Sequence, residues 1–130
     1  MSFRFEFDSV NKVLLFRVDG PLTDEVLAEA YRASRRHSAA TNPSAGIFDF
    51  TAVTDFPVST EFIRQMAKNE PAIPSDRPRA LIASQTHAFG LLRMFQIMGE
   101  QTRPNLHVVR TLDEAFEVLG IQSPHFEPLD

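Results

Sequence analysis

The sequence predicts an α/β domain in which one mixed sheet of five strands is covered by about four helices. The first observation behind this prediction is an N-terminal alternation of phenylalanine with charged residues, closely followed by a second apolar run. The second is a series of three short apolar runs that alternate with segments of helical periodicity. Strands that alternate with helices of about ten or more residues imply right-handed crossovers between parallel strands. The length of 130 residues fits one domain.

The N-terminal segment predicts an antiparallel hairpin. In residues 3–8 phenylalanine alternates with arginine, glutamate and aspartate, a period of two that is typical of a half-buried strand. Residues 13–18 form a more continuous apolar run, so we expect this second strand to be covered on both faces. Residues 9–12 provide the turn between the two strands.

A first helix and a third strand are predicted next. Gly20 and Pro21 break the second strand, and Thr23 is placed to cap a helix that fades near Ala40. The segment "AGIFDF", residues 45–50, is short and apolar and predicts the third strand. A second helix is expected to begin near residue 59.

The remaining elements continue the alternation. A loop with three prolines separates the second helix from the fourth strand. Thr111 and Glu114 have the spacing of a capping box, and Gly120 is placed to end the last helix. The expected elements are a strand at 79–84, a helix at 86–101, a strand at 105–110 and a helix at 111–120. The domain is therefore expected to span residues 1–122, with residues 123–130 as a C-terminal tail.

Composition excludes several classes of function. The chain has no cysteine, which excludes disulfides, thiolate metal sites and a cysteine nucleophile. A formal charge of −4 without a long basic run disfavours nucleic-acid binding. No apolar run is long enough to span a membrane or to form a signal peptide, so we expect a cytoplasmic protein. The four histidines lack metal-binding spacing, so no metal or other cofactor is expected.

Short polar residues follow the third and fourth strands. Ligands bind outside the carboxyl ends of parallel strands, and helix N-termini attract anions. The alternative is that these residues cap helices or face water. The candidate ligand-binding residues are Thr51, Thr54 and Asp55 after the third strand, and Ser84, Thr86 and His87 after the fourth.

The third helix carries apolar residues over an unusually wide arc. A helix that only covers a sheet needs a narrower apolar face. We therefore expect contact on a second side and predict a homodimer, with Met94, Phe95, Ile97 and Met98 as candidate interface residues. The alternatives are a lipid or other apolar ligand beneath the helix, or an ordinary deep core.

The segment "IFDFTAVTDFPVSTEF" resembles the strand–loop–helix of STAS domains, the group that contains the anti-sigma-factor antagonists. Asp49, Phe50, Thr51, Val53 and Phe56 match the family's Asp-apolar-Ser/Thr-x-Val-x-x-apolar stretch. The closing "VVRTLDEAFEVLG" is similar to the family's last strand and helix. The segment "HAFGLLRMFQIMGE" is similar to the SpoIIAA-like uncharacterised bacterial branch.

The resemblance also identifies a candidate regulatory residue. In the antagonists the first serine of Asp-Ser-Ser-Gly is phosphorylated, and Ser59 occupies that position here. Val58, Thr60 and Glu61 stand where the family has Asp, Ser and Gly. From the residues alone, the role of a helix cap is sufficient to explain Ser59 and is the preferred interpretation.

The resemblance implies a non-catalytic binding or regulatory module that takes part in protein–protein signalling. Two other interpretations remain open. A small-molecule or lipid-binding carrier would need an apolar cavity beneath the third helix. A small hydrolase-like enzyme would need Ser59 close to His87, or an aspartate–histidine pair.

Overall fold

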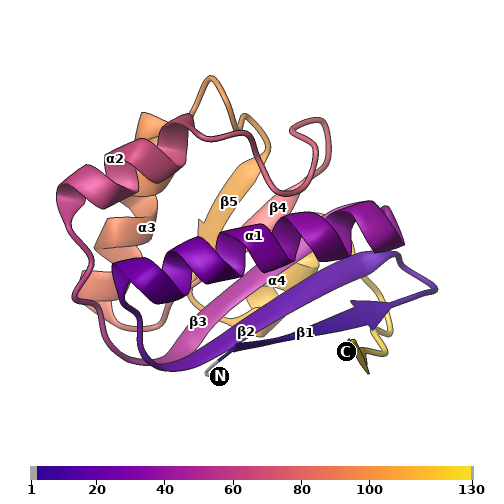
Figure 1. The fold of residues 1–130 in the computed structure, drawn as a ribbon. Helices are drawn as coiled ribbons and strands as arrows, with labels where there is room; N and C mark the ends of the chain where they lie inside the picture. The colour runs from indigo at the N-terminus through magenta and orange to yellow at the C-terminus, as the bar shows by residue number, and fades with distance from the viewer. Residues whose placement is uncertain (1–2, 130) are drawn as a thin grey trace.

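The computed structural model describes residues 3–129 and confirms an α/β fold with a mixed sheet (Figure 1). The N-terminal hairpin, the parallel strands and four helices all occur as predicted. The strands are β1 (Phe3–Asp8), β2 (Val13–Pro21), β3 (Ala45–Asp55), β4 (Arg79–Ile82), β5 (Leu106–Val109) and β6 (Glu127–Leu129). The helices are α1 (Asp24–Thr41), α2 (Thr60–Lys68), α3 (Thr86–Met98) and α4 (Leu112–Leu119).

The sheet has six strands in the order β5-β4-β3-β2-β1-β6, so the predicted count of five is wrong. Strands β2 to β5 are parallel, whereas β1 is antiparallel to both β2 and β6. The sixth strand comes from the segment that the sequence indicated as a tail. It has only three residues, and Pro128 is tolerated because β6 lies at the edge of the sheet.

The third strand is longer than its apolar run. It continues past residue 50 to Asp55, because β2 also continues to Pro21 and the two strands remain paired. Within this extension only Val53 is buried, and it lies opposite Gly20. The other residues of the extension are polar except for Ala52, which is exposed, so hydrophobic periodicity could not reveal this part of the strand.

The helix termini agree with the capping residues in the sequence. The Thr23 hydroxyl accepts a hydrogen bond from the Val26 N–H at 3.1 Å. Thr111 and Glu114 form the expected capping box, and Gly120 ends α4 in the left-handed conformation, with φ of 68°. Helix α3 ends at Met98, a few residues earlier than predicted, because the Gly99 N–H makes the last bond to the Phe95 carbonyl.

Two apolar clusters lie on opposite faces of the sheet. Helices α1, α2 and α3 cover one face, and α4 covers the other (Figure 1). The residues of β2 divide between them as predicted, with Leu14 and Phe16 on the first face and Val13 and Leu15 on the second. On the second face, α4 lies mainly over β3, β4 and β5.

A buried aspartate attaches the C-terminal segment to the hairpin. Asp8 is 1% exposed, and its carboxylate accepts hydrogen bonds from the backbone N–H groups of Val10, Asn11 and His125 and from the Asn11 amide. Burial raises the pKa of Asp8, but these hydrogen bonds outweigh it and hold the pKa below its ordinary value.

Candidate functional site

The carboxyl ends of the parallel strands lie along one edge of the sheet, as the parallel pairing of β2 to β5 requires. Asp49 of β3 pairs with Ile82 of β4, so Thr51 and Ser84, each two residues further on, follow paired positions. Both side chains are exposed. Thr51 and Ser84 therefore lie close together at this edge of the sheet, which we call the rim.

A second corner forms where β3 ends and α2 begins. The Leu22 N–H, just after β2, donates to the Asp55 carbonyl at 2.9 Å and closes the end of β3 against β2. Thr54, Asp55 and Ser59 are all exposed here. We call the segment from Thr54 to Thr60 the α2 corner. The predicted residues thus share one edge of the sheet but fall into two groups.

Ser59 caps α2. Its hydroxyl accepts a hydrogen bond from the Phe62 N–H at 3.0 Å, and its backbone is extended. Glu61 in the first turn forms an ion pair with Arg64 at 2.6 Å. The capping interpretation is therefore confirmed, while the exposed hydroxyl keeps its own proton available to a partner.

The start of α3 differs from that of α2. Its N-cap residue is Gln85, which makes no side-chain cap hydrogen bond, and Thr86 and His87 are exposed in the first turn. The guanidinium of Arg110 lies 4.1 Å from the centre of the Phe89 ring on this helix. This cation could not be predicted, because nothing in the sequence pairs a residue after β5 with one on α3.

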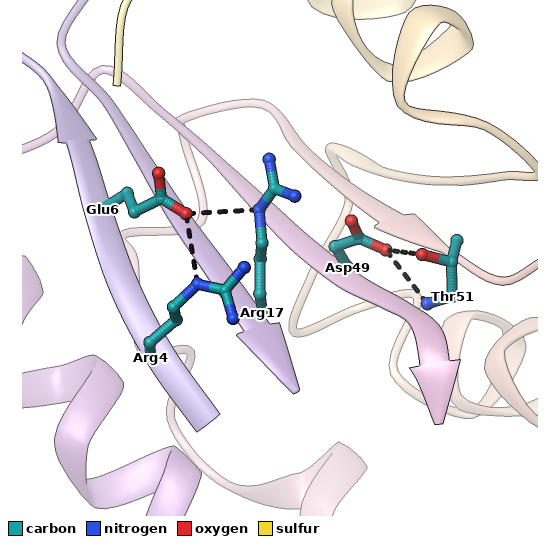
Figure 2. A network of polar contacts seen from close by, with 5 residues as sticks. All are labelled: Arg4, Glu6, Arg17, Asp49 and Thr51. Carbon is teal, nitrogen blue, oxygen red and sulfur yellow. Dashed lines mark hydrogen bonds and ion pairs between the residues drawn. The ribbon is translucent and has the colours of Figure 1, made fainter. Parts of the chain in front are cut away.

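A polar network lies on the same face of the sheet as α4, on the neighbouring strands β1, β2 and β3 (Figure 2). Glu6 forms ion pairs with Arg4 at 3.6 Å and with Arg17 at 3.2 Å. Asp49 is buried and accepts hydrogen bonds from the N–H and hydroxyl of Thr51, at 2.9 and 2.7 Å.

A small hollow of about 80 Å³ opens within this network. In the sequence, the charged residues of the hairpin are recognisable only as the outer half of an alternating pattern. Their position beside Thr51, whose hydroxyl is already bonded to Asp49, could not be predicted from that pattern.

A larger, mainly apolar cavity of about 130 Å³ lies between the sheet and helices α1, α2 and α3. Leu91, Leu92 and Phe95 place part of α3 over it, which is the feature that the carrier interpretation requires. Two arginines, Arg79 and Arg103, also line the cavity. Neither arginine could be recognised from the sequence as a site residue, because each lies beside apolar or loop residues.

The four candidate interface residues on α3 are not equivalent. Ile97 is 64% exposed and Met98 is 39% exposed. Met94 is half-buried, and Phe95 packs against the core and lines the cavity. Phe95 therefore faces the core of its own chain, and the dimer prediction depends mainly on Ile97 and Met98.

Within residues 3–129, no helix is long and apolar enough to cross a membrane. The same residues contain no group of three or more histidine, aspartate or glutamate side chains arranged to hold a metal ion. Among the described residues, Ser59 and His87 form no hydrogen bond with each other, and the Ser59 hydroxyl instead accepts from the Phe62 N–H.

Comparison with known proteins gives a structural match. No family model matches the sequence. No curated protein matches it either. Among solved structures, the chain is similar to an anti-sigma factor antagonist from Mycobacterium paratuberculosis, with a TM-score of 0.63 and 18% sequence identity. The match covers 92% of this chain and 95% of the other, and it confirms the STAS-like fold that the sequence predicts.

Proposed function

We propose that this chain is a non-catalytic, cytoplasmic regulatory module that binds another protein through the α2 corner. The observation that carries this proposal is the fold, which matches an anti-sigma factor antagonist over 92% of the chain. The fold places the end of β3 and the start of α2 at the rim of the sheet, where Thr54, Asp55 and Ser59 are exposed.

The α2 corner has the chemistry of a protein-binding surface that can be regulated. Its hydroxyl and carboxylate groups offer both hydrogen-bond donors and acceptors to a partner. A phosphate on Ser59 would add negative charge at a helix N-terminus, a position that favours anions. Glu61 opposes that charge, but its carboxylate is already paired with Arg64. Ser59 is accordingly the proposed point at which charge controls binding.

Site-specific crosslinking tests the proposal. A photoreactive residue is placed at Thr60, the first residue of α2, and in a second variant at Glu117 of α4, which is also exposed but lies on the other face of the sheet. The variants are expressed in the native host and irradiated. We expect one discrete crosslinked protein from position 60 only. Equal products from both positions, or none from position 60, would refute a partner site at this corner.

We further propose a homodimer formed through α3. Ile97 and Met98 expose apolar surface at the end of the helix, and methionine adapts well to contact surfaces. This surface is separate from the α2 corner, so a dimer would leave the proposed partner site open.

The cavity favours a second candidate function, that of a small-molecule carrier or sensor. Its walls are mainly apolar and belong to three helices and the sheet, which is typical of small-ligand sites in proteins.

A further inference from the structure

The cavity between α1, α2, α3 and the sheet contains positive charge without a matching negative charge. Its described lining residues include four with polar side chains, Tyr31, Ser34, Arg79 and Arg103, and none that is acidic. Ser34 donates to the Ala30 carbonyl at 2.7 Å, and Tyr31 donates to the Glu70 carbonyl. The hydroxyl protons of these two residues are therefore already used.

Arg79 is the unsatisfied member of this set. It is 3% exposed, and its Nε and Nη2 atoms have no hydrogen-bond partner among the described residues. Its side chain lies on the cavity side of β4, two residues before Leu81, which also lines the cavity. A buried guanidinium with unused donors is costly unless an anion completes it.

Arg103 adds a second charge instead of compensating the first. Its Nη1 donates to the Ala67 carbonyl at the end of α2, at 2.9 Å, and its guanidinium lies 4.9 Å from the centre of the Phe95 ring. No carboxylate lies within ion-pair distance of either arginine among the described residues, although Asp76 contributes at longer range.

The electrostatics agree with this geometry. Burial lowers the pKa of Arg79, the Arg103 guanidinium lowers it further and Asp76 raises it in part, so that the pKa lies at about 10. Arg79 therefore keeps its charge at neutral pH despite its burial and its like-charged neighbour. Such a site strongly favours a bound anion.

We propose that this cavity binds a small amphiphilic carboxylate, whose carboxylate group pairs with the free donors of Arg79 and whose apolar part fills the space beneath α3. A planar guanidinium binds a carboxylate through two parallel hydrogen bonds. The ligand also needs an apolar part, because the walls of the cavity are mainly apolar. A hydrated inorganic ion would leave these walls in contact with water.

The size of the cavity limits the ligand. Its volume of about 130 Å³ is close to the roughly 150 Å³ of an apolar protein cavity that holds one benzene molecule. The apolar part should therefore be about as large as a benzene ring or a short alkyl chain. Half-buried lining residues such as Leu27, Met66 and Leu91 give the cavity a route to the surface.

This inference rests on the small-molecule alternative and is independent of the α2 corner. The test uses hexanoate, the neutral 1-hexanol and inorganic phosphate as probes, with calorimetric titration and thermal unfolding of the whole chain. We expect hexanoate to bind and to raise the melting temperature, and 1-hexanol and phosphate to bind at least about tenfold more weakly.

Each of the other possible outcomes would overturn a specific part of the proposal. Equal binding of hexanoate and 1-hexanol would leave a small-molecule site but remove the carboxylate specificity. Binding of phosphate as strong as that of hexanoate would show a simple anion site. Absence of binding by all three probes would refute both the inference and the carrier function, without affecting the proposal for the α2 corner.

Substitution of the arginine provides the second measurement. Arg79→Met should weaken hexanoate binding by about ten- to a hundredfold, and the matched control Arg32→Met, at an exposed position on α1, should leave it unchanged. Without ligand, Arg79→Met should be at least as stable as the wild type, because it removes a buried charge that has no partner. A clear loss of stability together with unchanged hexanoate affinity would show that Arg79 is structural. If Arg79→Met does not fold, the comparison of hexanoate with 1-hexanol on the wild type decides the matter.

Discussion

Replacing Asp8 with asparagine should destabilise the protein strongly, because this buried carboxylate holds the C-terminal segment against the hairpin. One oxygen accepts the N–H groups of Val10 and Asn11, at 3.0 and 3.1 Å. The other accepts the Asn11 amide at 2.8 Å and the His125 N–H at 3.1 Å. In Asp8→Asn the amide oxygen can replace only one of these acceptors.

The magnitude follows from the two hydrogen bonds that are lost. The NH2 group of the new asparagine would take the place of one carboxylate oxygen. Because this group cannot accept hydrogen bonds, the two donors that bonded to that oxygen would remain unpaired. Hydrogen bonds to charged groups contribute about 1.5–3 kcal/mol each and are not additive, so we expect a loss of about 2–4 kcal/mol in the free energy of unfolding. For a chain of this size that corresponds to a fall of roughly 10 °C in melting temperature.

The effect should depend on pH in a defined direction. Because the folded pKa of Asp8 lies below its ordinary value of 3.8, the ionised carboxylate stabilises the fold above that pH. The contribution is lost as the pH falls through the lower, folded pKa. The difference between wild type and Asp8→Asn should therefore be full at neutral pH and shrink below about pH 4.

Urea and thermal unfolding over a pH series measure this difference, with Asp55→Asn, at the exposed last position of β3, as the matched control. The control should unfold like the wild type at every pH. If Asp8→Asn is as stable as the control at neutral pH, the carboxylate does not hold the C-terminal segment, and the account of the sixth strand is wrong.

Three further changes test other parts of the structure. Ser59→Ala should lower the free energy of unfolding in urea by about 1 kcal/mol, because the α2 cap is lost, whereas Ser59→Asn should keep the cap and the stability. Equal stability of the two variants would contradict the capping role. Gly46→Ala would place a Cβ in overlap with the Ile73 Cδ1 atom, so the free energy of unfolding should fall by about 1–3 kcal/mol. An unchanged melting temperature would mean that the buried Ile73 side chain moves aside freely. Ile97→Glu combined with Met98→Glu, the two exposed apolar residues of α3, should give a monomer on size exclusion, whereas an unchanged elution volume would place any dimer interface elsewhere.

The parts of the fold predicted from sequence are those in which local chemistry and burial agree. The hairpin followed from the alternation in residues 3–8, and the helix starts followed from Thr23, Ser59 and Thr111, whose hydroxyls all make the expected cap bonds. Strand β6 could not be predicted, because three residues carry no period and only pairing with β1 makes them a strand.

The only part of the candidate site that could be predicted from the sequence is the part that follows from the parallel direction of the strands. Parallel order places Thr51 and Ser84 at one edge of the sheet, and this needs no side-chain detail. The environment of Arg79 could not be inferred in the same way. Its burial depends on α1, α2 and α3 closing over one face of β4, which is a tertiary arrangement that no local pattern encodes.

The most direct test of the central claim is the affinity of the crosslinked partner for two variants of Ser59. Aspartate and asparagine cap a helix equally well, so Ser59→Asp and Ser59→Asn differ chiefly by one negative charge at the α2 corner. If this corner binds the partner under control of charge, calorimetric titration should show binding at least about tenfold weaker for Ser59→Asp, with Ser59→Asn close to the wild type. Equal affinities for the two variants would contradict the claim.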